Sequence, residues 1–445
     1  MALGMEVEIR LAVTNPAGEA ITEGDTVLLE HNYFTLVTDK FRGYSNLEFV
    51  MKHFDQFRDA AAAALDRRLA AMQTLAVALY KGDKKTLGAI VGGLMDKKDY
   101  TFQKVAYVEK GTNKKIVFAS DEVIIKLMDK DDRKLYIHYT IGFETQYWLQ
   151  VVRDVAQATR DDTDNSRPKT HAENAVKCAE SITQTLQTKA LAVLDKRAMR
   201  GHLALLYMQM MVFVERTAEL GLPELEEQKE DNAEEINGKK GEIEEFWEDL
   251  GLTEEDELNL KQRGALKLLK ADLVVLREQR RKLREKITAI TDTQPFGRGQ
   301  PKNKIAALPR ASLADAFGIL PKAVQTLLAR SKNREIVIDG LADDLEENFG
   351  LDFAESFSLE STEKGKATLI EYVRGGLGSG KSISQQVLFG GMNEVGIDTT
   401  TAKGKTLLPM EFRSILRSRV SWERLRKTDA PKVLAWAQDP ATNVL

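Results

Sequence analysis

The sequence Leu203-Ala-Leu-Leu-Tyr-Met-Gln-Met-Met-Val-Phe-Val214 is almost entirely apolar and opens a longer stretch that runs to Ile290. An acidic arm follows from Glu224 to Glu257, and a basic arm from Lys261 to Lys286. The apolar run is too short to cross a bilayer, which needs about 20 apolar residues. It therefore predicts a buried helix, from which the two arms of opposite charge project as a helical hairpin or coiled coil.

Both arms show the spacing of a coiled coil. In the basic arm, with Arg280 as the one polar exception, apolar residues occupy the a and d heptad positions: Leu266, Leu269, Leu273, Leu276, Leu283, Ile287 and Ile290. The acidic arm has a weaker register, carried by Ile236, Ile243, Phe246 and Leu250. Opposite charge favours antiparallel pairing of the arms, with the turn at Gly251–Glu254 or at Arg263–Gly264. Such a hairpin either packs only on itself or grips a neighbouring subunit.

Composition restricts the class of protein. A chain of 445 residues is long enough for two to four domains, and its net charge of −4 argues against a protein coated in positive charge. The single cysteine, Cys178, excludes an internal disulfide and fits a reducing compartment. The N-terminus lacks the basic and apolar regions of a secretory signal. We therefore expect a chain that is not secreted and has no membrane contact, cytoplasmic or within an assembled particle.

Residues 1–142 combine strand and helix periods. Glu6–Val13 alternates polar and apolar residues, and Thr26–Val37 predicts one or two further strands. The stretch from about Leu47 to Tyr80 predicts a helix that covers one face of the sheet. Two hairpins, at 102–119 and 122–141, complete the predicted antiparallel sheet.

Helical periods dominate after residue 142. Helices are predicted at Glu144–Arg160 and His171–Arg200, before the buried run. The fold class is therefore α+β and predominantly helical, with an N-terminal antiparallel sheet and covering helix, a central helical bundle with a charged coiled-coil hairpin, and a small mixed C-terminal region. The predicted division is an α+β domain at 1–142, a helical domain at 143–290 that includes the hairpin at 224–290, a linker at 291–311 and a mixed C-terminal region at 312–445.

The segment Ser312–Arg330 has the pattern of two short packed helices. Ala314 is a small residue in the first helix, Gly318 stands at the turn, and apolar residues surround both. The segment resembles the helix-turn-helix of DNA-binding proteins. The resemblance implies that four residues contact nucleic acid: Lys322, Gln325 and Thr326 in a major groove, and Arg330 with other basic residues at 298–304 and 330–334 on phosphate. The alternative is two core helices joined by a glycine turn.

A second motif, Gly375-Gly-Leu-Gly-Ser-Gly-Lys-Ser382, matches the phosphate-binding loop of nucleotide hydrolases. The resemblance implies that the backbone N–H groups around Gly375 and Gly380 hold phosphates, that Lys381 reaches the β- and γ-phosphates, and that Ser382 binds Mg²⁺. A strand predicted at Ala367–Val373 suits this loop. However, no apolar strand ending in aspartate follows to hold the metal, so we expect a structural turn without hydrolysis.

Nothing else in the sequence predicts catalysis. The five histidines have no metal-ligand spacing and no nucleophile motif is present, so we predict no metal, no cofactor and no enzyme, with nucleotide hydrolysis the one candidate activity. Our leading hypothesis is a non-enzymatic structural or assembly protein of a large multi-subunit complex, such as a phage virion-type particle. Its hairpin, 224–290, would contact copies of itself in a homo-oligomer, or other subunits. The alternatives are DNA binding through 312–330 and nucleotide binding through 375–382.

Overall fold

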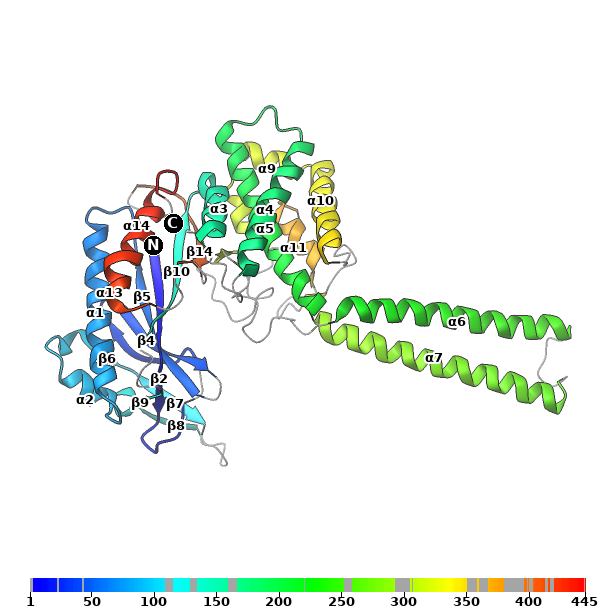
Figure 1. The fold of residues 1–445 in the computed structure, drawn as a ribbon, viewed down its shortest axis with the longest axis horizontal. Helices are drawn as coiled ribbons and strands as arrows, with labels where there is room; N and C mark the ends of the chain where they lie inside the picture. Colours follow the sequence, from blue (N-terminus) through cyan, green and yellow to red (C-terminus); the bar gives the residue numbers. More distant parts are fainter. Residues whose placement is uncertain are drawn as a thin grey trace.

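The computed structural model has the predicted fold class: it is 59% helical and 20% strand, with an antiparallel sheet built mainly from the N-terminal region. Figure 1 shows three parts, namely the sheet with its helices, a helical bundle beside it, and a long two-helix hairpin that extends from the bundle. The structure describes the whole chain except residues 1–2, 22–23, 42–43, 109–114, 129–133, 159–165, 220, 252–257, 293–304, 306, 350–357, 360–366, 380–395, 398, 400–402, 413–414, 417–419 and 444.

The main sheet has eight strands in the order β11-β14-β10-β1-β5-β4-β3-β6, and every neighbouring pair is antiparallel. Its strands are β1 (Leu3–Ile9), β3 (Val27–His31), β4 (Phe34–Phe41), β5 (Tyr44–Phe54), β6 (Tyr100–Phe102), β10 (Tyr136–Phe143), β11 (Leu308–Pro309) and β14 (Leu408–Phe412). The alternation that predicted a strand at 6–13 is confirmed, since it covers β1 and then β2 (Leu11–Thr14). The sheet thus joins strands from both ends of the chain.

The two predicted hairpins have different outcomes. The first is confirmed, because β7 (Lys104–Val108) pairs with β8 (Lys115–Ala119). The second is wrong, because β9 (Ile124–Leu127) pairs with β2, whereas β10 pairs with β1 and β14. Strand pairing across a long stretch of chain depends on contacts that the local alternation does not encode.

The covering helix is α1 (Ala61–Lys81), which buries a row of apolar residues along one side: Leu65, Leu69, Met72, Leu75, Ala76 and Leu79. The prediction that this helix starts near Leu47 is wrong, because residues up to Phe54 belong to β5. Their short apolar run fits either a buried strand or a helix, and tertiary pairing with β1 and β4 selects the strand. Short helices α2 (Leu87–Gly92), α13 (Trp422–Arg424) and α14 (Ala430–Gln438) complete this part.

The helical bundle surrounds α5 (Val193–Glu219), and every described side chain from Leu203 to Val212 is buried, as predicted. Around it lie α3 (Trp148–Ala158), α4 (Ser166–Thr185), α8 (Leu313–Gly318), α9 (Lys322–Leu328), α10 (Ser331–Phe349) and α11 (Leu369–Gly376). The single helix predicted over His171–Arg200 is wrong, because α4 ends at Thr185 and α5 begins at Val193. Among the described residues, no helix is both long enough and apolar enough to span a membrane.

The last third of the chain contributes to both parts. Helices α8 to α11 belong to the bundle, whereas β11, β14, α13 and α14 belong to the sheet part (Figure 1). The Arg310 guanidinium forms an ion pair with the carboxylate of Glu411, which is almost completely buried between β10 and β11. The segment 312–445 was expected to form a region of its own. Its described residues instead belong partly to the helical bundle and partly to the sheet, both of which also contain earlier parts of the chain.

Gly201 tests how closely α5 packs on α3. A Cβ atom at this position would lie 2.6 Å from the backbone N of Leu149 and 2.7 Å from Cβ of Trp148, so the helices would have to separate. We expect Gly201→Ala to lower the free energy of unfolding by about 1–3 kcal/mol in urea denaturation, in spite of alanine's higher helix propensity.

Gly238 is the matched control, because a Cβ atom there would have no atom within 4 Å apart from its own stretch of helix backbone. At this position the same substitution adds helix propensity without a clash, so Gly238→Ala should not lower stability. Equal responses of the two variants would show that contact between α3 and α5 does not limit residue size.

Candidate functional site

The candidate site is the hairpin of α6 (Leu222–Leu250) and α7 (Leu260–Asp292), which matches the predicted charged hairpin. Local residues define its ends. Gly251 ends α6 in the left-handed conformation with φ 60°. The candidate turn at Arg263–Gly264 is wrong, because both residues lie within α7, and residues 252–254 of the other candidate turn lie outside the described residues. Asn259 and Gln262 begin α7 with reciprocal hydrogen bonds, each side-chain oxygen accepting from the other residue's backbone N–H.

The seam between the helices follows the predicted heptads. In α7 the side chains of Leu266 and Leu273 are buried, and the other described positions of the heptad are half-buried: Leu269, Leu276, Arg280, Leu283 and Ile287. In α6, Ile236 is buried and the positions seven residues before and after it, Lys229 and Ile243, are half-buried. A sustained period of 3.5 residues keeps both stripes facing each other along the hairpin.

Two polar contacts fix the antiparallel register. Asn232 Nδ2 donates to Gln279 Oε1 at 3.4 Å, and Lys239 Nζ lies 3.7 Å from Asp272 Oδ2. The two contacts are seven residues apart on each helix and run in opposite directions, so they belong to one heptad register. Asn232 is buried in the seam, whereas Gln279 and Asp272 are exposed at its edge. A buried asparagine in a coiled-coil seam costs stability but disfavours other registers.

The outer surfaces of the two helices carry opposite charge. Over Leu222–Leu250 there are twelve acidic and three basic residues, whereas Leu260–Ile287 has ten basic and three acidic residues. Hydrogen bonding from Arg281 lowers the pKa of the Glu278 carboxylate, and hydrogen bonding to Glu242 raises the pKa of Lys239. The side chains are therefore charged at neutral pH, and a partner meets one acidic and one basic edge.

The helix-turn-helix-like segment lies in the bundle as α8 and α9. Its predicted apolar set packs inward, with Leu313, Val324 and Leu327 buried. Lys322, Thr326 and Arg330 are exposed, but Gln325 Nε2 donates to the backbone oxygens of Gly318 and Leu320 and thereby braces the turn. The basic flank at 298–304 lies outside the described residues. DNA contact through this segment stays a prediction.

The strand predicted before the glycine loop, at Ala367–Val373, is wrong. Only Ala367 and Thr368 are extended, as β13, and α11 follows. The buried residues Tyr372, Val373, Gly376 and Leu377 have helical spacing, which a short apolar run conceals in the sequence. A helix thus stands where a phosphate-binding loop requires a strand.

The described first half of the glycine loop is used for packing. Gly375 is buried, and the N–H groups of Leu377, Gly378 and Ser379 donate to the backbone oxygens of Arg374 and Gly375. Gly378 has φ 75°, and a Cβ atom there would collide with the ring of Phe317. These N–H groups close the end of α11 instead of pointing at an anion. Gly380, Lys381 and Ser382, the other predicted ligands, lie outside the described residues.

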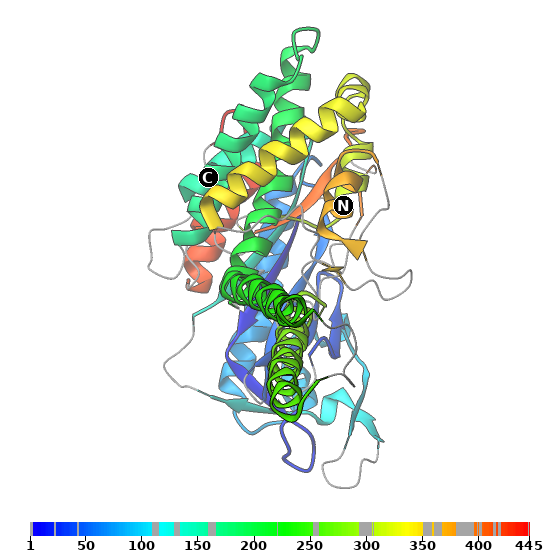
Figure 2. The same ribbon diagram turned by 90° about the vertical axis from the view of Figure 1, so that its right-hand side faces the viewer.

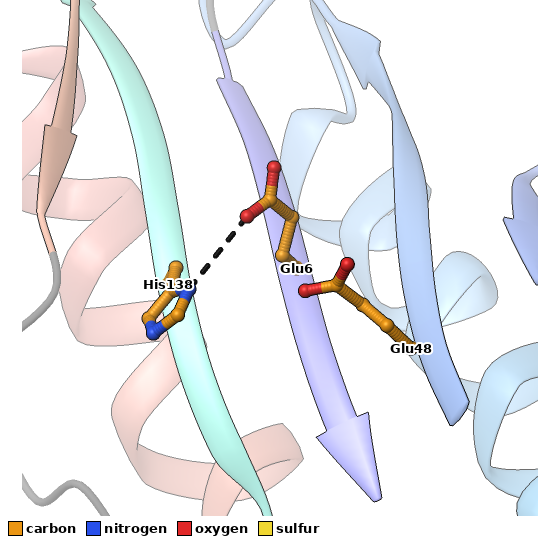
Figure 3. Close-up of side chains that lie close together, drawn as sticks. All are labelled: Glu6, Glu48 and His138. Carbon is orange, nitrogen blue, oxygen red and sulfur yellow. Dashed lines mark ion pairs between the residues drawn. The ribbon is translucent and has the colours of Figure 1, made fainter. Parts of the chain in front are cut away.

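A cluster that the sequence did not predict lies on the main sheet (Figure 3). Ligand atoms of Glu6, Glu48 and His138 lie within 4.8 Å of one another, on the neighbouring strands β1, β5 and β10. His138 Nδ1 is 3.6 Å from Glu6 Oε2 and 3.9 Å from Glu8 Oε1. The donor set suits a divalent cation, but it equally suits ion pairs of a protonated histidine, and Glu6 and Glu48 have further interactions. Glu6 and His138 are far apart in sequence, so only the strand register brings them together.

No protein-family model, no curated protein and no solved structure matches the chain.

His202 links the bundle to the glycine loop and gives a pH test. It is fully buried in α5, and its Nε2–H donates to the backbone oxygen of Gly376. Burial lowers the pKa of His202 to about 4, because the imidazolium would lose its hydration. In the unfolded chain the pKa is about 6.5, so between these values only the unfolded state gains the proton.

The contribution of neutral, buried His202 to the free energy of unfolding should therefore be fully present above pH 6.5, and it should decrease as the pH drops towards 4. At pH 5 the contribution of His202 to this loss is about 2 kcal/mol. We expect His202→Gln, which keeps an N–H donor for Gly376, to lose less stability than the wild type between pH 7 and pH 5 in urea denaturation. His31 and His53 titrate in both proteins and cancel. Equal losses in the two proteins would contradict this assignment.

Proposed function

We propose that the chain is a non-enzymatic assembly protein and that the hairpin α6–α7 is its subunit contact. The observation that carries this proposal is the position of the hairpin. The two helices pack mainly on each other and extend away from the sheet and the bundle, pointing towards the viewer in Figure 2. With 33 residues, α7 is about 50 Å long.

Energetic considerations support a role in binding. A two-helix hairpin of this length buries only one narrow seam, and each helix leaves most of its surface in water. The sheet and the bundle bury their cores without the hairpin. Outside the hairpin, α6 mainly contacts α5, and α7 mainly contacts β12 (Ser358–Leu359). An extension that adds little to folding, yet has a defined register and two edges of opposite charge, is suited to recognise another protein.

Charge in the seam tests this proposal. Leu266→Asp with Leu273→Asp places two carboxylates at buried positions, so the helices should separate. We expect the purified variant to keep the folded sheet and bundle but to lose assembly with itself or with co-purified subunits, measured as particle mass by light scattering.

Val193→Asp with Leu194→Asp is the charge control, because it adds the same two carboxylates at exposed positions at the start of α5, outside the hairpin. It should keep the seam and hold the assembled mass closer to that of the wild type. If the seam variant assembles like the wild type, the hairpin is not the contact.

A further inference from the structure

The outer face of α7 carries a second apolar stripe, in addition to its seam. Leu260, Leu268 and Val275 are 92%, 69% and 55% exposed, and exposed Gly264 and Ala271 lie between them. Steps of four, four, three and four residues place these five positions on one helical face. At 100° per residue this face is roughly opposite to the seam of Leu266 and Leu273.

Large aliphatic side chains of this kind rarely stand in a row in water. Val274, 63% exposed, extends the stripe at one edge. The stripe covers the half of α7 next to the hairpin tip, a length of about 23 Å. Beyond Val275 the same face continues with Glu278, Lys282 and Lys286, so the apolar part has a definite end. A row of exposed leucine and valine with polar borders is typical of a protein contact.

The order of sizes along the stripe points to its occupant. Leu260, Gly264, Leu268, Ala271 and Val275 alternate large, small, large, small, large, and this order is the same in both directions. Two such helices packed antiparallel about Leu268 place Leu260 of one copy opposite Val275 of the other. Leu268 of each copy then enters the space beside Gly264 and Ala271 of the other, as a knob enters a hole. A pattern that reads the same both ways suits a two-fold interface, in which one surface binds itself.

Charges beside the stripe fit the same arrangement. Lys261 and Asp272 border one edge, seven residues before and four residues after Leu268. In the antiparallel arrangement Lys261 of each copy therefore lies two to three residues, about 3–4.5 Å along the helix, from the level of Asp272 of the other copy, and the long lysine side chain can span this distance. Asp272 already lies 3.7 Å from Lys239 Nζ within its own hairpin, so the added lysine completes a group of alternating charges. Lys267, at the other edge, faces its own copy and opposes close approach there. Between exposed charges this repulsion is weak compared with burial of the aliphatic side chains.

We propose that α7 binds α7 of a second copy of this chain through the stripe Leu260–Val275. The two α7 helices pack antiparallel, so that the two hairpins overlap near their tips. This inference rests on the proposed function and identifies the partner of the hairpin. One stripe of this length is smaller than a standard protein interface, so the dimer should form and dissociate with concentration. Burial of apolar surface drives it, so it should persist in high salt, whereas pairing between acidic α6 and basic α7 of two copies would weaken.

Sedimentation of the full-length protein over a range of concentrations, at low and high salt, tests the inference. We expect a monomer–dimer equilibrium for the wild type that survives high salt. Leu268→Ser with Val275→Ser should weaken dimerisation at least tenfold and leave helix content unchanged, because both side chains are exposed. Arg277→Ser with Arg284→Ser, on the other side of α7, introduces the same residues outside the stripe and should dimerise within a few-fold of the wild type.

Cross-linking tests the orientation. A cysteine at the centre, Leu268→Cys, should link two copies through a short thiol reagent, because the two-fold axis brings residue 268 of both copies together. Glu242→Cys, exposed on α6, should not. The buried native thiol of Cys178, whose pKa burial raises, should not react in the folded protein.

Several results would overturn the inference: a wild type that is monomeric at every concentration, a dimer that dissociates in high salt, a serine pair in the stripe without effect, or cross-linking through Glu242→Cys in place of Leu268→Cys. These results leave the proposed function open to its own test. If the seam variant Leu266→Asp with Leu273→Asp then loses a different subunit, the hairpin is a contact but its partner is not a second copy.

Discussion

Burial of α5 is the constraint on which the rest of the structure depends. From Leu203 to Val212 this helix has no face suited to water, so it has to be enclosed on all sides. Helices α3 and α4 precede α5 in the sequence and cover part of its surface. Helices α8 to α11 follow the hairpin in the sequence and cover a further part of that surface. The chain therefore returns to the bundle after α7. The Gly376–Leu313 and His202–Gly376 contacts, between segments far apart in sequence, are consequences of that enclosure.

The return of the chain also explains the sheet. After α11 the chain leaves the bundle, and β14 pairs with β10 while α14 lies near α1. Buried Gln56 donates to the backbone oxygens of Gly142 and Ala437 and so ties three distant segments together. Since both ends of the chain complete one sheet, the hairpin is an excursion from the middle of the chain. Its two helices leave the bundle and return to it, and their outer faces stay in water, where they can meet a partner.

Burial and exposure also distinguish the roles of the sequence motifs. Helix α7 places a buried seam on one side and an exposed aliphatic stripe on the other, and the exposed stripe is not required for the hairpin itself to form. The glycines of 375–378 serve a different purpose, because they allow the end of α11 to approach Leu313 and Phe317. The cluster of Glu6, Glu48 and His138 lies on the half-buried face of the sheet, where carboxylates and a histidine can satisfy one another. The described glycines of a motif that matches a phosphate-binding loop thus have a packing role, whereas two carboxylates and an imidazole that no sequence motif joins lie together on the sheet.

By itself, the sequence determined whatever depends on neighbours a few residues away. The heptads of α6 and α7, the apolar run of α5 and the alternation of β1 are patterns that repeat or continue within one segment. The structure of each segment could therefore be predicted from its own residues. Leu47–Phe54 and Ala367–Val373 were assigned wrongly because a short apolar run suits a strand and a helix equally, and only its tertiary partners decide between them. The tertiary structure alone decided that β9 pairs with β2, that β14 lies beside β10, and that His138 meets Glu6. Each of these pairings closes a long loop, and its register is set by side chains that the local sequence does not contain.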